Sequence, residues 1–537
     1  MIRRALPLTL LPLVVACDGP VPPSSVGTPE QRAALFDTVL ARVERREAFS
    51  PVKNDALAFD PLASVRALRE DVIAAESESE LFYALSRLSN ARRDRHLDVA
   101  LVPGGLRVPE ARGLPHADEE QDVAPLHAPL KVLPDYGTTG APDFFVSDLP
   151  VGADTLAADA PRLGDRIVRV NGRPVAQYLA DVEPYHRYSS LPNHWWRLAM
   201  ALPERSALLP PEFYGERLEL ELERADGSRV AVTLPYLEPE TLTWMGTAEP
   251  RYPGFREELR TGTWDLWLPE PGTPRAIVLR WHGFRETLLE DVDALMELAA
   301  ARGLLDHAVI VDGTRSRGGS KGAYALQRLS PHPFRVTFGN LRLSDITLPF
   351  IDDKRAEAAA GGALDSGVGE TMDDGGWLLD WLEHDVLDSL AAGARYTDAV
   401  PFKLAHLPKD SDGILQPAPV HFRGPLILLL GPQGGSHLDQ FAAQVIDNGL
   451  GHTLGMPAGG YSNTWEWEEV LTLPGSGRPL VRFMYDIGHT LRPNGRILEG
   501  EAAPVDDFIP LTRANFRTYY RILLERALAS LEGGRTA

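Results

Sequence analysis

Ser436 stands at a point in the sequence where a serine hydroxyl could act as a nucleophile. An apolar run over residues 425–430 leads into a glycine-rich turn at 431–435, and a helical pattern then continues to Asn448-Gly449. A hydroxyl at the start of a helix projects from a tight bend, beside the unpaired amides of the first helical turn. A nucleophilic serine needs an exposed oxygen and nearby donors for the oxyanion that it generates. An ordinary N-cap serine occupies the same position, so other parts of the chain must decide between the two interpretations.

Composition and motif content exclude several other kinds of site. The 54 basic and 75 acidic residues give a net charge of −21, which argues against binding to nucleic acid or to anionic membrane surfaces. The single cysteine, Cys17, rules out intramolecular disulfides and cysteine-based metal clusters. The sequence contains no His-Glu-x-x-His motif, and we expect neither a metal nor a cofactor. An α/β-hydrolase elbow needs glycine two residues after the nucleophile, where this chain has Leu438.

Residues 1–17 have the organisation of a bacterial lipoprotein signal peptide. A charged start at residues 1–4 precedes an apolar segment, 5–16, that is too short to span a bilayer as a mature helix. The sequence Leu-Val-Val-Ala-Cys17 resembles a lipobox, in which the cysteine becomes lipidated; a plain signal peptide that happens to contain a cysteine is the alternative. Residues 18–28 are typical of a flexible tether. We therefore expect a lipid anchor at Cys17 and a location in the bacterial cell envelope, facing the periplasm or the outer surface.

Three domains are predicted after the tether. Residues 29–115 show helical hydrophobic spacing and include the triplet Asp94-Arg95-His96. Residues 130–240 contain the string PRLGDRIVRVNGRPV, which resembles the core of PDZ domains, and also a predicted Asp226-Gly227 hairpin and a helical insertion. PDZ domains bind extended peptides and chain termini by adding a strand to their sheet.

The third predicted domain, residues 250–537, alternates strands and helices. We expect strands at 276–281 and 308–312, helices at 288–302 and 321–329, and an insertion at 330–420 that separates them from the Ser436 segment. Alternation of strands and helices predicts an α/β core.

The order of these segments resembles that of the carboxyl-terminal processing (tail-specific) serine peptidases and of their relative, the tricorn core protease. The motifs that carry the resemblance are VIVDGTRSRGGS, GPQGGSHLDQFAAQVIDNG and LGMPAGGYSN, with weaker matches at the PDZ-like string and at Asp94–His96. The resemblance implies a multidomain α/β protein: a ClpP/crotonase-like catalytic core, an N-terminal helical cap and a PDZ-like β-rich domain. It places the nucleophile at Ser436, and the oxyanion hole at Gly318, Gly319 and the amide of His437.

One residue departs from the family pattern, because Tyr461 stands where the tail-specific enzymes carry a lysine base. Tricorn-like members use a histidine from the first core strand, which makes His282 the candidate general base; a histidine bonded to a loop carbonyl is the alternative. His489 and Lys321 are weaker candidates. Glu499 or Glu501 could orient an imidazole, and nothing in the sequence selects between them.

Two functional hypotheses follow from this pattern. The first is an envelope-anchored serine endopeptidase that cleaves unstructured polypeptide segments, with Ser436 as nucleophile and His282 as base. The second is an inactive relative that binds peptides with the same groove and PDZ-like domain. The missing lysine favours the second hypothesis, whereas the glycine pair, the serine and the histidine favour the first.

Overall fold

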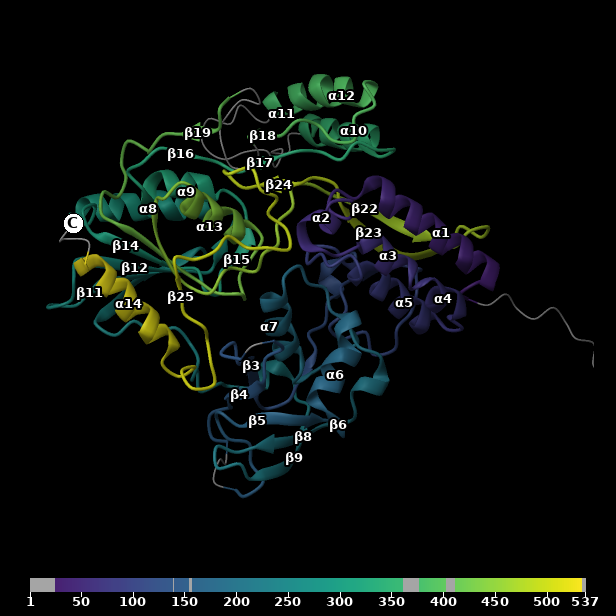
Figure 1. The fold of residues 1–537 in the computed structure, drawn as a ribbon, viewed down its shortest axis with the longest axis horizontal. Coiled ribbons are helices and arrows are strands. Elements are labelled where there is room, and N and C mark those ends of the chain that lie inside the picture. The colour runs from purple at the N-terminus through teal and green to yellow at the C-terminus, as the bar shows by residue number, and fades with distance from the viewer. Residues whose placement is uncertain (1–24, 139, 154–156, 361–375, 402–410, 534–537) are drawn as a thin grey trace, which may run out of the picture.

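The chain forms an α/β core, an N-terminal helical region and a β-rich region, which lie at the left, right and bottom of Figure 1. The computed structural model describes residues 25–138, 140–153, 157–360, 376–401 and 411–533. The predicted signal peptide, with Cys17, and most of the predicted tether lie outside these ranges. No helix within them combines the length and the hydropathy that crossing a membrane requires.

A seven-stranded sheet forms the centre of the core, in the order β10-β11-β12-β14-β20-β21-β25. Neighbouring strands from β12 to β25 are parallel, whereas β10 and β11 add an antiparallel edge. The strands are β10 (Phe255–Arg260), β11 (Trp264–Pro269), β12 (Ala276–Trp281), β14 (Ala308–Asp312), β20 (Leu426–Leu430), β21 (Gly451–Gly455) and β25 (Asp507–Phe508). The predictions for β12 and β14 are confirmed to the residue, because continuous apolar runs suit strands buried on both faces.

Helices cover both faces of this sheet (Figure 1). One face carries α8 (Leu288–Ala301), α9 (Gly322–Leu329) and α13 (His437–Asp447), and the other carries α14 (Tyr519–Gly533). Successive residues of a strand point to opposite faces of the sheet and pack against the helices on each face. Val309 and Val311 pack with α8, α9 and α13, whereas Ile310 packs with α14. The sheet thereby fixes the end of β20, from which the chain turns into α13.

The N-terminal helices are α1 (Pro29–Arg46), α2 (Lys53–Leu57), α3 (Pro61–Arg66), α4 (Arg69–Ala74) and α5 (Glu78–Asn90). The chain continues from α5 into β1 (Val99–Leu101), which pairs with the C-terminal strand β23 (Pro479–Asp486) and, through it, with β22 (Glu466–Thr472). Phe36 and Leu85 share one hydrophobic cluster with Phe483. The helical region is therefore joined to the C-terminal part of the chain by strand pairing as well as by packing.

The segment predicted as an insertion packs on the same cluster. Its helical part consists of α10 (Thr347–Ala359), α11 (Gly376–Trp381), a π-helical turn η5 (Leu382–Val386) and α12 (Leu387–Ala391). Phe350 and Trp381 are buried against the N-terminal helices and β23. Residues 361–375 and 402–410 of the predicted insertion lie outside the described ranges.

The β-rich region is built on an antiparallel sheet with the order β3-β4-β5-β8-β9, and β6 also pairs with β5. Its elements are β3 (Lys131–Pro134), β4 (Phe144–Asp148), β5 (Arg166–Val170), β6 (Arg173–Pro174), α6 (Val175–Val182), α7 (Leu191–Ala201), β8 (Arg217–Glu223) and β9 (Arg229–Pro235). The predicted Asp226-Gly227 hairpin is present, because Gly227 closes the turn between β8 and β9. Asn171 and Gly172 also have positive φ, between β5 and β6.

Short elements complete the described chain. The two-stranded and three-stranded pairings outside the main sheets use β2 (Leu126–His127), β7 (Glu204–Arg205), β13 (Gly283–Phe284), β15 (Arg317–Gly319), β16 (Phe334–Arg335), β17 (Phe338–Gly339), β18 (Val400–Pro401), β19 (Ile414–Leu415) and β24 (Thr490–Leu491). Single 3₁₀ turns are η1 (Glu119–Gln121), η2 (Glu183–Tyr185), η3 (Pro211–Phe213) and η4 (Pro239–Thr241).

Candidate active site

Ser436 occupies the residue before α13 in a backbone conformation that serine rarely adopts. Its φ is 60° and its ψ is −121°, and its side chain makes no capping hydrogen bond to the helix. Such a conformation costs about 1–3 kcal/mol and persists where the surroundings enforce it. Here the Ser436 amide donates to the carbonyl oxygen of Tyr461 at 2.9 Å. The hydroxyl is therefore not used as an N-cap, and the N-cap interpretation of this serine is wrong.

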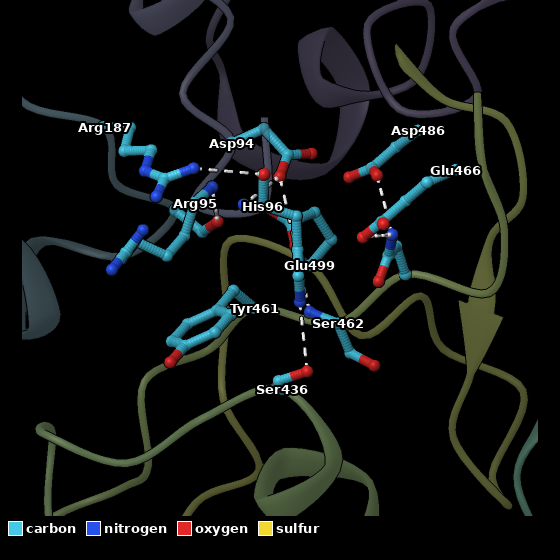
Figure 2. A network of polar contacts seen from close by, with 12 residues as sticks. Asp94, Arg95, His96, Arg187, Ser436, Tyr461, Ser462, Glu466, Asp486 and Glu499 are labelled. Atoms are coloured by element: carbon cyan, nitrogen blue, oxygen red, sulfur yellow. Dashed lines mark hydrogen bonds and ion pairs between the residues drawn. The ribbon is translucent and has the colours of Figure 1, made fainter. Parts of the chain in front are cut away.

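The imidazole of His96 meets this hydroxyl. The distance from His96 Nε2 to Ser436 Oγ is 3.0 Å, although the two residues are 340 positions apart in the sequence (Figure 2). His96 lies on the loop between α5 and β1, so the pairing of β1 with β23 brings it to the core. Burial lowers the pKa of His96, which keeps the ring neutral and able to accept a proton.

The predicted base, His282, does not fill this role. Its Nε2 lies 3.0 Å from Asp265 Oδ1, a buried carboxylate on the neighbouring strand β11. His489 is also engaged elsewhere, because its Nε2 is 2.8 Å from the carbonyl oxygen of Ala48. Among the described residues, the side chain that hydrogen-bonds the Ser436 hydroxyl is His96, and neither His282, His489 nor Lys321 does so.

Buried carboxyl groups lie behind His96. A ring nitrogen of His96 and one oxygen each of Asp94 and Glu499 all lie within 4.8 Å of one another. Asp94 Oδ1 accepts a 3.0 Å hydrogen bond from the His96 amide and lies 3.9 Å from Nδ1. Glu499 Oε2 accepts from the Ser462 amide at 3.1 Å. The other predicted glutamate, Glu501, is exposed and paired with Arg496, so the structure selects Glu499 as the one near the imidazole.

Lys53 supplies the positive charge for this buried cluster. Its Nζ lies 3.6 Å from Asp94 Oδ2 and 3.4 Å from Glu499 Oε1. Burial alone would raise the pKa of Asp94, but the charge of Lys53, a hydrogen bond with Asp486 and the neighbouring His96 together outweigh burial and lower the pKa. Burial raises the pKa of Glu499, and the charge of Asp94 raises it further. A protonated His96 would therefore face the ionised carboxylate of Asp94, which stabilises its new charge.

The same three side chains have the donor types and the spacing that a metal ion could use. Two features of the structure argue against a metal ion at these side chains. Lys53 already places a cation against both carboxyl groups, and Nε2 of His96 is directed at Ser436 (Figure 2). A divalent ion at this place would meet strong repulsion from the lysine ammonium.

Gly318 lies directly against the serine, as the family resemblance predicted. A Cβ atom built on Gly318 would stand 2.5 Å from Ser436 Cβ, 2.8 Å from Oγ and 3.2 Å from the amide nitrogen of His437. Gly319 has a φ of 136°, and a Cβ there would stand 1.8 Å from the carbonyl oxygen of Phe284. Gly318 and the His437 amide therefore lie beside the Ser436 side chain, whereas Gly319 allows β15 to approach β13.

Asp439 and Tyr461 hold the loop that supports the serine. Asp439 accepts hydrogen bonds from the amides of Gly460 and Tyr461 at 3.0 and 3.1 Å, and burial raises its pKa to about 7. The Tyr461 ring packs edge-on against His96, with ring centroids 5.1 Å apart. The residue that replaces the family lysine thus packs against the imidazole that contacts Ser436.

The β-rich region also reaches the site, through the segment that enters α7. Ser190 Oγ donates to the carbonyl oxygen of Gly459 at 2.5 Å. The side-chain Nδ2 of Asn193 donates to the carbonyl oxygen of Pro432 at 2.7 Å. Arg187 donates to the carbonyl oxygen of His96 at 3.3 Å. All three regions of the fold therefore meet around Ser436.

Sequence reasoning located the serine but missed His96. The signal was present, because the Asp94–His96 triplet is one of the segments that resembles the processing peptidases. The triplet lies in the predicted helical domain, whereas the resemblance to tricorn-like members placed the base after the first core strand, at His282.

Comparison with solved structures identifies the architecture. The chain superposes on mature CPAF with a TM-score of 0.68 and 17% sequence identity, over 95% of this chain and 99% of that chain. Mature CPAF complexed with lactacystin gives a TM-score of 0.66 and 14% identity, over 94% and 99%. The photosystem II D1 C-terminal processing protease matches over 93% and 98%, with 14% identity and a TM-score of 0.40.

No protein-family model matches the sequence, and no curated protein matches it by sequence. The structural overlap with CPAF nevertheless extends over the helical, β-rich and core regions together, since nearly all of both chains is covered. The predicted multidomain α/β class is confirmed. The chain has the fold of mature CPAF along almost its whole length.

Proposed function

We propose that this protein is a serine endopeptidase in which Ser436 is the nucleophile and His96 is the general base. The observation that carries the proposal is the 3.0 Å contact between His96 Nε2 and Ser436 Oγ, at a serine that is held in a strained turn and does not cap its helix. A nucleophile within hydrogen-bond reach of a base that is itself backed by carboxylates is the general arrangement of serine hydrolases. The resemblance of the sequence motifs to processing peptidases supports the same function.

The proposed reaction begins with neutral His96. Its Nε2 takes the proton of Ser436 Oγ as the oxygen attacks the carbonyl carbon of a peptide bond. The resulting oxyanion lies beside the amide of His437 and the Gly318 loop, and the carboxylate of Asp94 stabilises the imidazolium. The C–N bond then breaks, and His96 returns its proton to the departing amine. A water molecule, deprotonated by the same imidazole, hydrolyses the acyl-enzyme and regenerates Ser436.

The missing lysine no longer argues for an inactive protein. That hypothesis depended on Tyr461 leaving the serine without a base, and His96 now provides one at hydrogen-bond distance. Burial lowers the pKa of His96, so the ring is mainly neutral at pH 7. Ser436 is also partly exposed, and a substrate carbonyl can therefore reach it.

Unstructured polypeptide is the substrate class that we propose, with capture by the β-rich region. Its antiparallel sheet has open edges at β3 and β9, to which an extended segment could add a strand, as PDZ domains do. The contacts from Ser190 and Asn193 to the serine loops connect this region to the site. Peptide binding to a Ser436→Ala protein should then slow hydrogen exchange at β3 or β9; unchanged exchange at both would remove strand addition from the account.

The proposed setting remains the bacterial envelope, with Cys17 as the lipid attachment site. The support for it is the lipobox-like sequence together with the use of a single cysteine in the whole chain.

Hydrolysis of a disordered protein such as casein tests the proposed function. The wild type should cleave it and should also react covalently with a fluorophosphonate probe, which labels activated serines. Ser436→Ala should do neither, and Ser530→Ala, which removes a hydroxyl from the distant helix α14, should behave as the wild type. A wild-type protein that is folded, cleaves no disordered substrate and takes up no probe would contradict the proposal.

A further inference from the structure

A cavity of about 600 Å³ lies between α5, α7 and the segment that follows His96. Three arginines line it: Arg95, Arg187 and Arg197. Arg95 directly precedes His96 in the chain, and Figure 2 shows Arg95 and Arg187 on the same side of His96, near Tyr461. The cavity therefore adjoins the proposed active site through the loop that carries the base.

Two of these arginines are partly buried and have no partner in the described part of the chain. Among the described residues, the guanidinium groups of Arg95 and Arg197 form no hydrogen bond and no ion pair, and the Nε atom of each is fully buried. Burial and the charges of Arg187 and Arg197 lower the pKa of Arg95 well below its usual value. A guanidinium group that is partly withdrawn from water loses hydration, so such groups are usually paired with an acceptor. The arrangement is that of a site that is complete only when an anion occupies it.

The acidic groups around the cavity do not supply that anion. Asp98 is already shared between Arg187 at 3.2 Å and Arg482 at 3.4 Å. Asp122 accepts hydrogen bonds from the backbone and ring of His116. Burial raises the pKa of Glu204 to about 7, against the opposing charge of Arg197, so this carboxyl group carries only part of a charge at neutral pH.

Another titratable group in the wall is His186. Burial, followed by the charges of Arg95 and Arg197, lowers its pKa to about 4, so it is neutral at physiological pH and can donate a hydrogen bond without adding charge. Phe82, Tyr185 and Met200 add apolar surface to the wall. A ligand with a carboxylate on an extended, partly apolar body fits this lining, because guanidinium forks bind carboxylates in pairs of hydrogen bonds.

We propose that the cavity is a specificity subsite that binds a carboxylate of the polypeptide substrate through Arg95 and Arg197. The inference rests on the proposed peptidase function and adds a substrate class to it: chains that carry a carboxylate near the cleaved bond. That carboxylate has two possible sources, the free C-terminus of the chain or an Asp or Glu side chain. A polypeptide is favoured over a small free anion because the cavity adjoins His96 and has room for several side chains.

Binding to the full-length Ser436→Ala protein tests the subsite without requiring turnover. One fluorescent peptide pair differs only in a free or amidated C-terminus, and a second pair differs only in an internal Glu or Gln. The carboxylate member of one pair should bind at least about tenfold more tightly, as expected for a charge-assisted hydrogen bond of roughly 1.5–3 kcal/mol. The pair that discriminates identifies the source of the carboxylate.

Arginine variants on the Ser436→Ala background complete the experiment. Arg197→Gln should abolish the discrimination, Arg95→Gln should act in the same way, and Arg197→Lys should restore part of it. The control is Arg521→Gln, an exposed arginine on α14, which should leave the discrimination intact. Circular dichroism and Tm establish that each variant is folded, and Arg95→Gln carries the test if Arg197→Gln does not fold.

The outcomes separate this inference from the proposed function. Equal binding of both members of both pairs would overturn the subsite, whether or not the wild type cleaves peptides. Discrimination that survives both Gln substitutions would also overturn it. Discrimination that depends on Arg197, in a protein whose wild type cleaves nothing, would support the carboxylate site while the peptidase proposal fails.

Discussion

Gly318→Ala should disable the enzyme while leaving it folded. The new Cβ would stand 2.5 Å from Ser436 Cβ and 2.8 Å from Oγ, whereas ordinary carbon contacts lie at about 3.5–4.0 Å. Ser436 or the Gly318 loop must therefore move by about 1 Å. Because Ser436 is held by Tyr461 on one side and by α13 on the other, the displacement falls on the reacting atoms. A misplacement of about 1 Å costs roughly 10²-fold in rate, or about 2.7 kcal/mol.

The assay is kcat/KM on a fluorogenic peptide, with Tm measured in parallel. Gly283→Ala is the matched control, since it lies on the neighbouring strand β13 and its new Cβ would meet nothing closer than 3.4 Å. It should keep nearly full activity. Overpacking at Gly318 costs about 1–3 kcal/mol of stability, so the variant should remain folded. A Gly318→Ala protein with kcat/KM within about threefold of the wild type would refute the placement of this loop against the serine.

Three further predictions follow. The acid limb of the kcat/KM profile should have its midpoint below pH 6.5, because burial lowers the pKa of His96. Only the neutral ring accepts a proton, so activity is full above that pKa and lost below it. A midpoint above pH 6.5 would contradict this prediction. Glu499→Gln should lower kcat at least about tenfold with KM little changed, whereas Glu501→Gln, at an exposed position, should not, and equal effects would remove Glu499 from the mechanism. Cys17→Ser should move the protein from the membrane fraction to the soluble envelope fraction. If the variant stays in the membrane fraction after a salt wash, the anchor lies elsewhere in the chain.

Local pattern was enough to predict much of the core. The strand at 276–281 is β12, the helix at 288–302 is α8 within one residue, and the turn before α13 carries the serine, because each depends on residues that are neighbours in the chain. The positive φ at Asn171 and Gly172 likewise follows from a two-residue Asn-Gly turn.

The base could not be predicted in the same way, because its position depends on contacts between distant segments. His96 reaches Ser436 only because β1 pairs with β23, a partner almost 400 residues later in the chain, which no local pattern indicates. His282 does follow the core strand as expected, but its Nε2 lies 3.0 Å from Asp265 Oδ1 on the adjacent β11. The pairing of β11 with β12 places that carboxylate beside it, and the sequence alone did not relate the two.

The packing of the helical region against the C-terminal strands could not be predicted from the sequence for the same reason. Residues 29–115 have the helical spacing of a separate domain, yet Phe36 and Leu85 are buried in one cluster with Phe483 and Trp381. Hydrophobic spacing identifies which face of a helix is buried but not which distant segment covers it.

A double-mutant cycle on kcat tests the central claim, that His96 and Ser436 act as one unit. Ser436→Ala, His96→Ala and the double variant should all reduce kcat to the same residual level, because removing either member of a catalytic unit removes the function of both. His282→Ala should retain most of the wild-type kcat in the same assay. A His96→Ala protein that is folded and active, or a His282→Ala protein as inactive as Ser436→Ala, would contradict the account.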